Sequence, residues 1–210
     1  MIYLWEHTDL LTQDFVEASG AYLSRQRKEK TEQYSSLRHK INSCAVYLLL
    51  RYGLWREYGI REAPVFMIGA HDKPFLSSSG IHFNLSHCKN AVCCILSHEN
   101  TAIDITDFRP FHPSVLRRVC SPAEQEMIRS SQKPQMDFLR LWTRKECYAK
   151  LKGEGLSMNF CRITDDIPEV AAIRTFQMEQ FFCSYYTKEK DPERLFPTQE
   201  EILAVMRQLD

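Results

Sequence analysis

The sequence has no run that approaches the roughly 20 consecutive apolar residues of a membrane-spanning helix. Its first residues, MIYLWEHTDLL, lack the basic start and apolar core of a secretory signal. It also contains no low-complexity segment and no obvious repeat. We therefore expect a cytoplasmic protein that does not interact with a membrane.

An excess of one charge sign is also missing, because 27 Lys and Arg residues balance 27 Asp and Glu residues. No net field favours nucleic acid as a partner, so local clusters must carry any anion binding. With 210 residues, 44% of them hydrophobic, the chain can bury a core as one large domain or two small ones.

Several signature motifs are absent, namely a Walker loop, a kinase glycine loop, GxSxG and HExxH. The eight cysteines show neither a CxxC pair nor the Cys/His spacing of a zinc site, which predicts reduced structural thiols. They are Cys44, Cys88, Cys93, Cys94, Cys120, Cys147, Cys161 and Cys183.

The segment 137–156, DFLRLWTRKECYAKLKGEGL, has the periodicity of an amphipathic helix that ends at glycine. Lys145 falls in the middle of its apolar stripe, where a charge must either extend past the core or meet a partner. Glu146 and Lys150 have i,i+4 spacing on the flank of this stripe. Taken alone, the pair is typical of a solvated helix face.

A strongly basic segment, 24–40, precedes an apolar helical segment at 41–59. It includes Arg27 and Lys30, and it predicts either a solvated helix face or a site for a phosphate-rich ligand.

Strands are predicted at 2–5, 82–87, 91–97 and 101–107, and alternation is clear in 82–87 and 101–107. On the last of these, a period of two places Asp104 and Thr106 on the face opposite Ile103 and Ile105. An isolated Asp at a strand end is often only a turn or cap residue.

Helices are expected at 113–119 and 122–131, strands near 159–164 and 170–186, and a polar helix after Pro197. Strand, helix and further strands thus occur once in each half of the chain. This order favours an α+β fold with two similar halves, 1–99 and 100–210.

Two carboxylates from separate elements, together with phosphate oxygens, are the usual way in which a protein holds Mg²⁺. Asp104 and Glu146 could supply the carboxylates, while Lys150, Lys73 and His87 could neutralise phosphate charge. The set indicates phosphoryl-type transfer from a pyrophosphate, in which positioning and charge neutralisation dominate.

Three motifs resemble, in order and spacing, those of the Sfp-type 4′-phosphopantetheinyl transferases. They are FNLSH at 83–87, AIDIT at 102–106 and WTRKECYAKLKGEGL at 142–156. The sequence DKP at 72–74 resembles the family's Lys-Pro turn, and the resemblance covers roughly residues 25–156. It implies two α+β halves related by a pseudo-twofold axis, with coenzyme A (CoA) between them.

The resemblance also implies an activity. Such an enzyme transfers the 4′-phosphopantetheine arm of CoA to a serine hydroxyl of an apo acyl or peptidyl carrier protein and releases 3′,5′-ADP. The carrier supplies the nucleophile, and the pseudo-dimeric chain is expected to be a monomer.

By the same resemblance, Asp104 and Glu146 would be Mg²⁺ ligands, and Glu146 or a water that it holds would be the base. Lys150 would contact the pyrophosphate. The remaining CoA-side residues implied are His87, Arg27 and Lys30 at the 3′-phosphate, Lys73 and Pro74 near the adenine, and Ser86.

Thr106 departs from the family pattern, because the family's Asp-x-Glu has an acid at this position. A hydroxyl contributes no charge, so the metal would keep an extra water or bind more weakly. Asp107 is expected to point to the opposite face, unless the strand has already ended.

Two other functions remain open. One is a degenerate family member that binds CoA or a carrier domain without transferring anything, although retention of Asp104, Glu146 and Lys150 argues against it. The other is a structural α+β domain with coincidental motifs.

Overall fold

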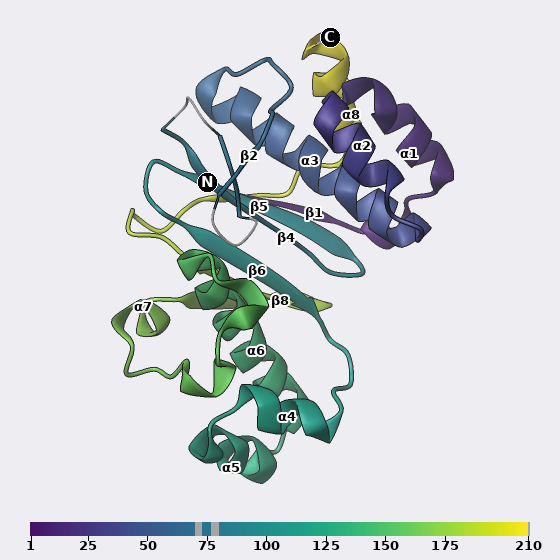
Figure 1. The fold of residues 1–210 in the computed structure, drawn as a ribbon. Coiled ribbons are helices and arrows are strands. Elements are labelled where there is room, and N and C mark those ends of the chain that lie inside the picture. Colours follow the sequence, from purple (N-terminus) through teal and green to yellow (C-terminus); the bar gives the residue numbers. More distant parts are fainter. Residues whose placement is uncertain (70–72, 77–79, 210) are drawn as a thin grey trace.

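The computed structural model describes residues 1–69, 73–76 and 80–209, except for the side chain of Leu156. Its strands form two main sheets, and the long helices pack against the outer faces of these sheets (Figure 1). The predicted α+β class is therefore confirmed.

The first sheet has the strand order β4-β5-β1-β9, and helix α3 packs against it. β1 is antiparallel to β5 and parallel to β9. Large side chains such as Tyr47 and Leu48 are completely buried in this part of the core. Its elements are β1 (Ile2–Glu6), β4 (His82–His87), β5 (Ala91–Ser97), β9 (Arg194–Leu195), α1 (Gln13–Ser19), α2 (Arg25–Glu32), α3 (Leu37–Tyr58) and α8 (Gln199–Leu209).

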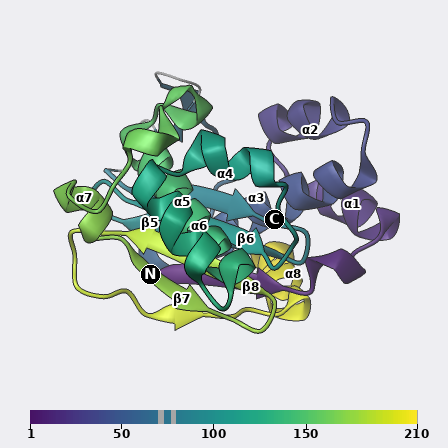
Figure 2. The ribbon, with the colours of Figure 1, turned by 90° about the horizontal axis from the view of Figure 1, so that it is seen from below.

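The second sheet is antiparallel, with the order β6-β8-β7, and helix α6 packs on β6 and β8. Figure 2 shows α6 lying across this sheet with α4 and α5 beside it. β2 (Met67–Ile68) and β3 (Pro74–Phe75) pair in a separate two-stranded sheet. The elements around the second sheet are β6 (Ala102–Asp107), β7 (Arg174–Gln177), β8 (Phe181–Tyr186), α4 (Pro113–Val119), α5 (Pro122–Ser130), α6 (Pro134–Lys152) and α7 (Pro168–Ala171).

The two sheets meet through a shared apolar layer and a seam of polar contacts. Ile2 and Cys93 from the first sheet pack with Ile103 and Ile105 from the second. Strands β4 and β6 lie side by side at this junction, and β4 side chains accept hydrogen bonds from the β6 backbone. Asn84 Oδ1 accepts from the Ile103 N–H at 3.0 Å, and Ser86 Oγ from the Ile105 N–H at 3.4 Å. The seam therefore fixes which residues of the two sheets face each other.

Helix α6 begins at Pro134, three residues before the predicted start, and ends at Gly153 as predicted. Gly153 has a φ of 76°, a conformation that glycine adopts without a Cβ penalty, and its N–H bonds the carbonyls of Ala149 and Lys150. Lys145 in the apolar stripe meets a partner, because its ammonium donates to Glu124 Oε2 at 2.7 Å and to the carbonyls of Val119 and Phe160. All three N–H groups are thus satisfied inside the protein.

Three secondary-structure predictions were wrong in part. The segment 159–164 forms a 3₁₀ turn at Phe160–Arg162, because Asn159 caps it by accepting from the Cys161 N–H and the Phe160 ring stacks on Trp142. The segment 170–186 begins as helix α7, and only then forms β7 and β8. The last helix is amphipathic, since it buries Ile202, Val205 and Met206 in the first core.

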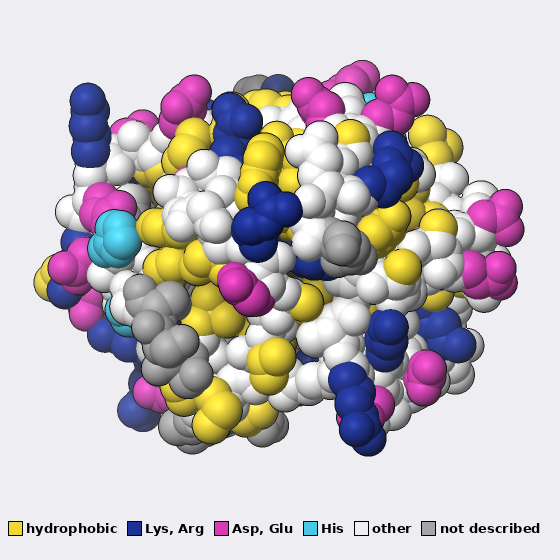
Figure 3. Space-filling model, turned by 90° about the horizontal axis from the view of Figure 1, so that it is seen from above, with side chains coloured by type: hydrophobic (Ala, Val, Ile, Leu, Met, Phe, Trp, Pro, Cys, Tyr) yellow, Lys and Arg dark blue, Asp and Glu magenta, His cyan; other side chains and the backbone are white. Residues whose placement is uncertain are grey.

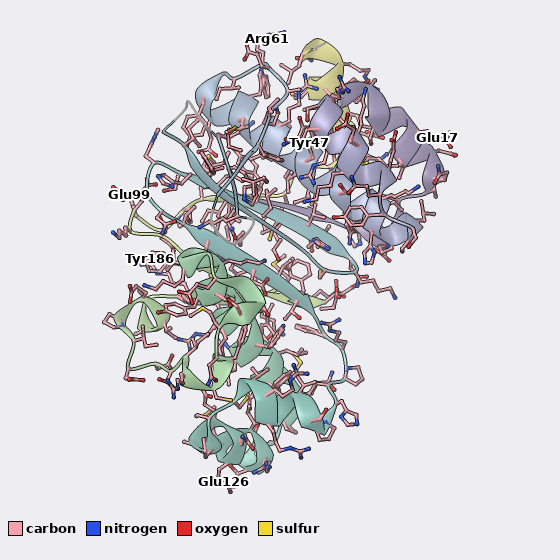
Figure 4. All side chains as sticks on the ribbon, viewed as in Figure 1. Glu17, Tyr47, Arg61, Glu99, Glu126 and Tyr186 are labelled. Carbon is pink, nitrogen blue, oxygen red and sulfur yellow. The ribbon has the colours of Figure 1, made fainter. Side chains whose placement is uncertain are left out.

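The chain returns to its first half at the end, because β9 pairs with β1 and α8 packs on α3. In Figure 4, Tyr47 lies in the α3 region, whereas Tyr186 and Glu126 lie in the region of α6 and α5. The division at residues 99 and 100 and the pseudo-twofold relation remain predictions, and residues 194–209 would be an exception to that division.

The exposed surface carries no dominant charge on the face shown in Figure 3, where acidic and basic side chains are interspersed with hydrophobic ones. All eight cysteines are free thiols, and seven of them are buried. Among the described residues, no helix is both long and apolar enough to cross a membrane.

Candidate active site

Asp104 lies in the polar seam between the sheets, where its side chain is only 9% exposed. Its Oδ1 accepts hydrogen bonds from Lys150 Nζ at 2.7 Å and from Ser86 Oγ at 2.9 Å. Its Oδ2 accepts from the Thr143 hydroxyl at 2.8 Å. Strand β4, strand β6 and helix α6 therefore all contribute to holding one carboxylate.

Lys150 reaches the seam from the last turn of α6 and also contacts Ser86 Oγ at 2.6 Å. The carbonyls of Ile103 and Leu85 lie at 3.3 and 3.5 Å from its nitrogen. Burial disfavours the charged ammonium, but the attraction and hydrogen bond of Asp104 outweigh this effect, so the pKa of Lys150 is raised. The lysine is therefore a cation at neutral pH.

Glu146 lies one helical turn before Lys150 and makes no hydrogen bond or ion pair with any described residue. Burial raises the pKa of Glu146 to about 7, and repulsion by Asp104 adds to this effect, while Lys150 partly offsets it. A carboxyl group poised near neutrality beside a second carboxylate suits either a cation or a proton transfer.

A cavity of about 330 Å³ opens onto these groups, with Asp104, Thr106 and Glu146 in its wall. Thr106 is buried and lies on the face of β6 opposite Ile103 and Ile105, which belong to the apolar layer between the sheets, as period two predicted. Asp107 also lines the cavity at the very end of the strand, but its carboxylate accepts hydrogen bonds from the Lys89 and Asn90 N–H groups. It therefore holds the turn between β4 and β5.

A second cavity, of about 380 Å³, is basic and lined by Arg27, Lys30, His39 and His87. Arg27 is only 7% exposed, and it donates to Ser43 Oγ at 3.4 Å and lies over the Tyr47 ring. Within the described part of the chain it has no acidic partner, and burial lowers its pKa. A buried guanidinium without a counter-ion makes this cavity a candidate anion site.

The two cavities are neighbours, since His39, Asn42 and His87 belong to the walls of both. The His87 ring is accessible, yet partial desolvation in this concave surface lowers its pKa, and the nearby basic groups Lys150, His39 and Arg27 lower it further. One extended ligand could therefore place an anionic group in the basic cavity and another beside Asp104.

A third cavity, of about 330 Å³, lies beyond Pro74, which also lines the basic cavity. Its wall includes Lys73 and Gly153. Burial lowers the pKa of Lys73. The structure thus places Lys73 and Pro74 in the wall of a cavity that adjoins the basic one. Asp72 of the predicted Asp72-Lys73-Pro74 turn lies outside the described residues.

The sequence reasoning missed Thr143, Asn84 and Asn42. Thr143 is completely buried and precedes Glu146 and Lys150 by three and seven residues, so helical spacing alone could have placed it on their face. Asn84 shares a strand face with Ser86, but its bond to β6 depends on contacts between sheets that no local pattern reveals.

The fit to a divalent cation depends on two carboxylates. Among the described residues, no group of three or more His, Cys, Asp or Glu side chains is arranged to hold a metal ion. Glu146, which has no partner in the described part of the chain, and Asp104 nevertheless supply the hard oxygen ligands that Mg²⁺ prefers, provided that a ligand completes the coordination.

Comparison with known proteins adds independent information. A family model described as the 4′-phosphopantetheinyl transferase superfamily matches residues 101–205, which is half of the chain. A Bacillus subtilis protein named 4′-phosphopantetheinyl transferase is 26% identical over 142 residues, covering 66% of this chain and 63% of the relative. The chain thus spans slightly less than two thirds of that relative.

Two further relatives carry similar names. The 4′-phosphopantetheinyl transferase Sfp of Bacillus subtilis strain 168 is 26% identical over 152 residues, covering 70% of this chain and 68% of its own length. The 4′-phosphopantetheinyl transferase HetI of Nostoc sp. strain PCC 7120 is 28% identical over 166 residues, covering 74% of this chain and 70% of its own length. The residues that resemble the family motifs at 102–106 and 142–156 fall inside the matched family region.

Proposed function

The chain belongs to the 4′-phosphopantetheinyl transferase superfamily, and we propose that it transfers the 4′-phosphopantetheine arm of CoA to a serine hydroxyl of an apo carrier protein, with Mg²⁺ as cofactor. The observation that carries the proposal is a groove formed by two adjoining cavities, which share His39, Asn42 and His87 and extend from Arg27 to Asp104 and Glu146. CoA has phosphate groups at two separated positions, and this groove offers cations at both.

The groove suggests how CoA would lie. Its 3′-phosphate would occupy the basic cavity, where Arg27, Lys30 and His87 would supply charge and hydrogen bonds. Its pyrophosphate would lie beside Lys150, with Ser86 next to that lysine. The adenine would then extend towards Lys73 and Pro74.

Asp104 and Glu146 would hold the Mg²⁺, with Thr106 beside them. When bound, the ion would neutralise charge on the pyrophosphate and on the leaving group. Asp104 is already fixed in place by Thr143 and Ser86, so its carboxylate needs little reorganisation.

The reaction requires a base because the attacking serine hydroxyl is neutral. Its oxygen would form a bond to the phosphorus that carries the pantetheine arm, while the bond from this phosphorus to the bridging oxygen breaks. The bridging oxygen leaves on 3′,5′-ADP, and the serine proton passes to the Glu146 carboxylate or to a water that Glu146 holds. Lys150 would compensate the charge that grows on the leaving pyrophosphate oxygens.

The test is incubation of the protein with CoA, Mg²⁺ and an apo carrier protein, followed by mass spectrometry of the carrier. We expect the carrier to gain one phosphopantetheine arm, and a carrier whose acceptor serine is replaced by alanine to gain none. Binding of CoA without any mass change would instead support the alternative of a non-catalytic family member.

His87→Ala should raise the KM for CoA while leaving kcat less affected, because the ring is expected to contact the 3′-phosphate rather than the reacting phosphorus. Dephospho-CoA lacks that phosphate, so its KM should change much less. Steady-state kinetics with both substrates provide the measurement. Equal losses for the two substrates would mean that His87 acts only on the structure of the β4–β5 turn.

Thr106→Glu should lower the Mg²⁺ concentration needed for half-maximal transfer, because it adds a third carboxylate to the cavity that contains Asp104 and Glu146. Thr106→Val should raise this concentration modestly, if the hydroxyl orients a water on the metal. The measurement is a Mg²⁺ titration of the transfer rate at fixed CoA. Three superimposable curves would show that position 106 does not contribute to the metal site.

A further inference from the structure

Lys150 has no N–H group to spare for a ligand in this structure. Four oxygen atoms surround its nitrogen, and the two shortest contacts are Ser86 Oγ at 2.6 Å and Asp104 Oδ1 at 2.7 Å. The carbonyl oxygens of Ile103 and Leu85 complete the set. An ammonium has only three N–H groups, so these acceptors saturate it.

The same contacts affect what Asp104 can bind. Its Oδ1 already accepts from both Lys150 and Ser86, and its Oδ2 accepts from Thr143. A divalent cation that approached Oδ1 would meet a like charge within hydrogen-bond distance of the same oxygen. In a site where the Asp104 side chain is only 9% exposed, such repulsion is weakly screened.

We propose that the Lys150 ammonium occupies the cation position at Asp104 in the ligand-free protein, and that it leaves this position only when a pyrophosphate offers it new oxygen partners. The proposal depends on the proposed function only in naming CoA as the source of that pyrophosphate. Lys150 exchanges Asp104 and Ser86 for pyrophosphate oxygens, and the divalent cation takes the vacated side of Asp104. Metal and CoA therefore bind as a pair, and metal alone binds weakly.

Competition by Lys150 and a merely supporting role of Lys150 predict opposite changes in metal affinity when the lysine is removed. If Lys150 only positions Asp104, then removing the lysine weakens metal binding together with transfer. If Lys150 competes with the metal, then removing it strengthens metal binding while transfer falls. Metal affinity therefore distinguishes the two roles without reference to activity.

The experiment measures binding of Mn²⁺ alone, without CoA, to the full chain at pH 8 by electron paramagnetic resonance of the free ion. Lys150→Met removes the charge but keeps the length of the side chain, and we expect it to bind Mn²⁺ at least about tenfold more tightly than wild type. Lys150→Arg keeps the charge and should bind as weakly as wild type. Lys152→Met is the matched control, because this lysine is paired with Glu169 on the outside of the same helix, and it should leave the affinity unchanged.

Ligands provide the second arm. CoA should tighten Mn²⁺ binding to wild type, whereas 3′,5′-ADP, which lacks the pyrophosphate, should do so much less. In Lys150→Met the effect of CoA should shrink, since no competing ammonium remains to be moved. Circular dichroism of each variant confirms that it is folded before binding is measured.

A folded Lys150→Met protein that binds Mn²⁺ no more tightly than wild type would overturn the proposal, as would equal effects of CoA and 3′,5′-ADP on wild type. Neither result bears on whether wild type modifies a carrier. A wild-type protein that fails to transfer the arm would overturn the proposed function, while the effect of Lys150→Met on Mn²⁺ affinity would stand.

Discussion

Glu146→Gln should reduce the rate of phosphopantetheine transfer by about 10²-fold or more while the fold survives. The substitution keeps the size and shape of the side chain but removes the carboxylate that we assign to Mg²⁺ and to the serine proton. No hydrogen bond or ion pair to another described residue is lost, so the structural cost is small. Single-turnover transfer at saturating CoA provides the measurement, and near-normal turnover would contradict the assignment.

The same variant should be more stable than wild type at high pH. The folded-state pKa of Glu146 is raised to about 7 from an ordinary value of 4.5, so the folded protein prefers the protonated form. Wild type therefore loses stability as the pH rises from about 4.5 through 7, when the folded state must give up a proton that the unfolded state has already lost.

The Glu146→Gln variant has no titrating group at this position. The amount by which it is more stable than wild type should therefore grow between about pH 4.5 and 7 and level off above pH 7. Urea denaturation of both proteins without metal, at pH 5 and pH 8, tests the sign. An advantage that is the same at both pH values would show that the carboxyl group is not perturbed by burial.

Much of the α+β fold could be predicted because the decisive signals are local. The alternation in 82–87 and 102–107 and the helical period of 137–152 each specify one element, and Gly153 ends the helix by its φ of 76°. The strand predicted at 159–164 does not form, because Phe160 is buried against Trp142 without belonging to a strand. Hydrophobicity alone does not distinguish a buried turn from a buried strand.

The candidate site also has residues that the sequence indicates and contacts that it does not. Asp104, Glu146 and Lys150 could be selected from sequence only as a set, because two carboxylates and a lysine suit a Mg²⁺–pyrophosphate site and because their motifs resemble those of the family. What could not be predicted is that Ser86 and Thr143 both donate to the Asp104 carboxylate, since these contacts join three elements that are far apart in the chain. The seam between β4 and β6 brings them together, and no periodicity in either strand encodes it.

Asp104→Asn should abolish most activity, by about 10²-fold or more, and should also lower the free energy of unfolding by about 1–3 kcal/mol. The stability loss arises because Lys150 keeps its charge but loses its counter-ion at 2.7 Å. It should be smaller than for a fully buried pair, since the Lys150 side chain is 26% exposed and water can solvate part of the charge. Asp107→Asn is a comparison for the stability readout alone, because Asp107 lines the same cavity but bonds the Lys89 and Asn90 N–H groups rather than the Lys150 ammonium.

A double variant separates structure from chemistry at this position. Asp104→Asn combined with Lys150→Met removes both charges, so its loss of stability should be smaller than the sum of the two single losses. Transfer should nevertheless stay as low as in Asp104→Asn, because the metal ligand is still missing. Urea denaturation and the transfer assay on all four proteins give the two readouts. Additive stability losses would mean that Asp104 and Lys150 are not coupled in the folded protein, and recovery of transfer in the double variant would mean that Asp104 serves only to neutralise the lysine.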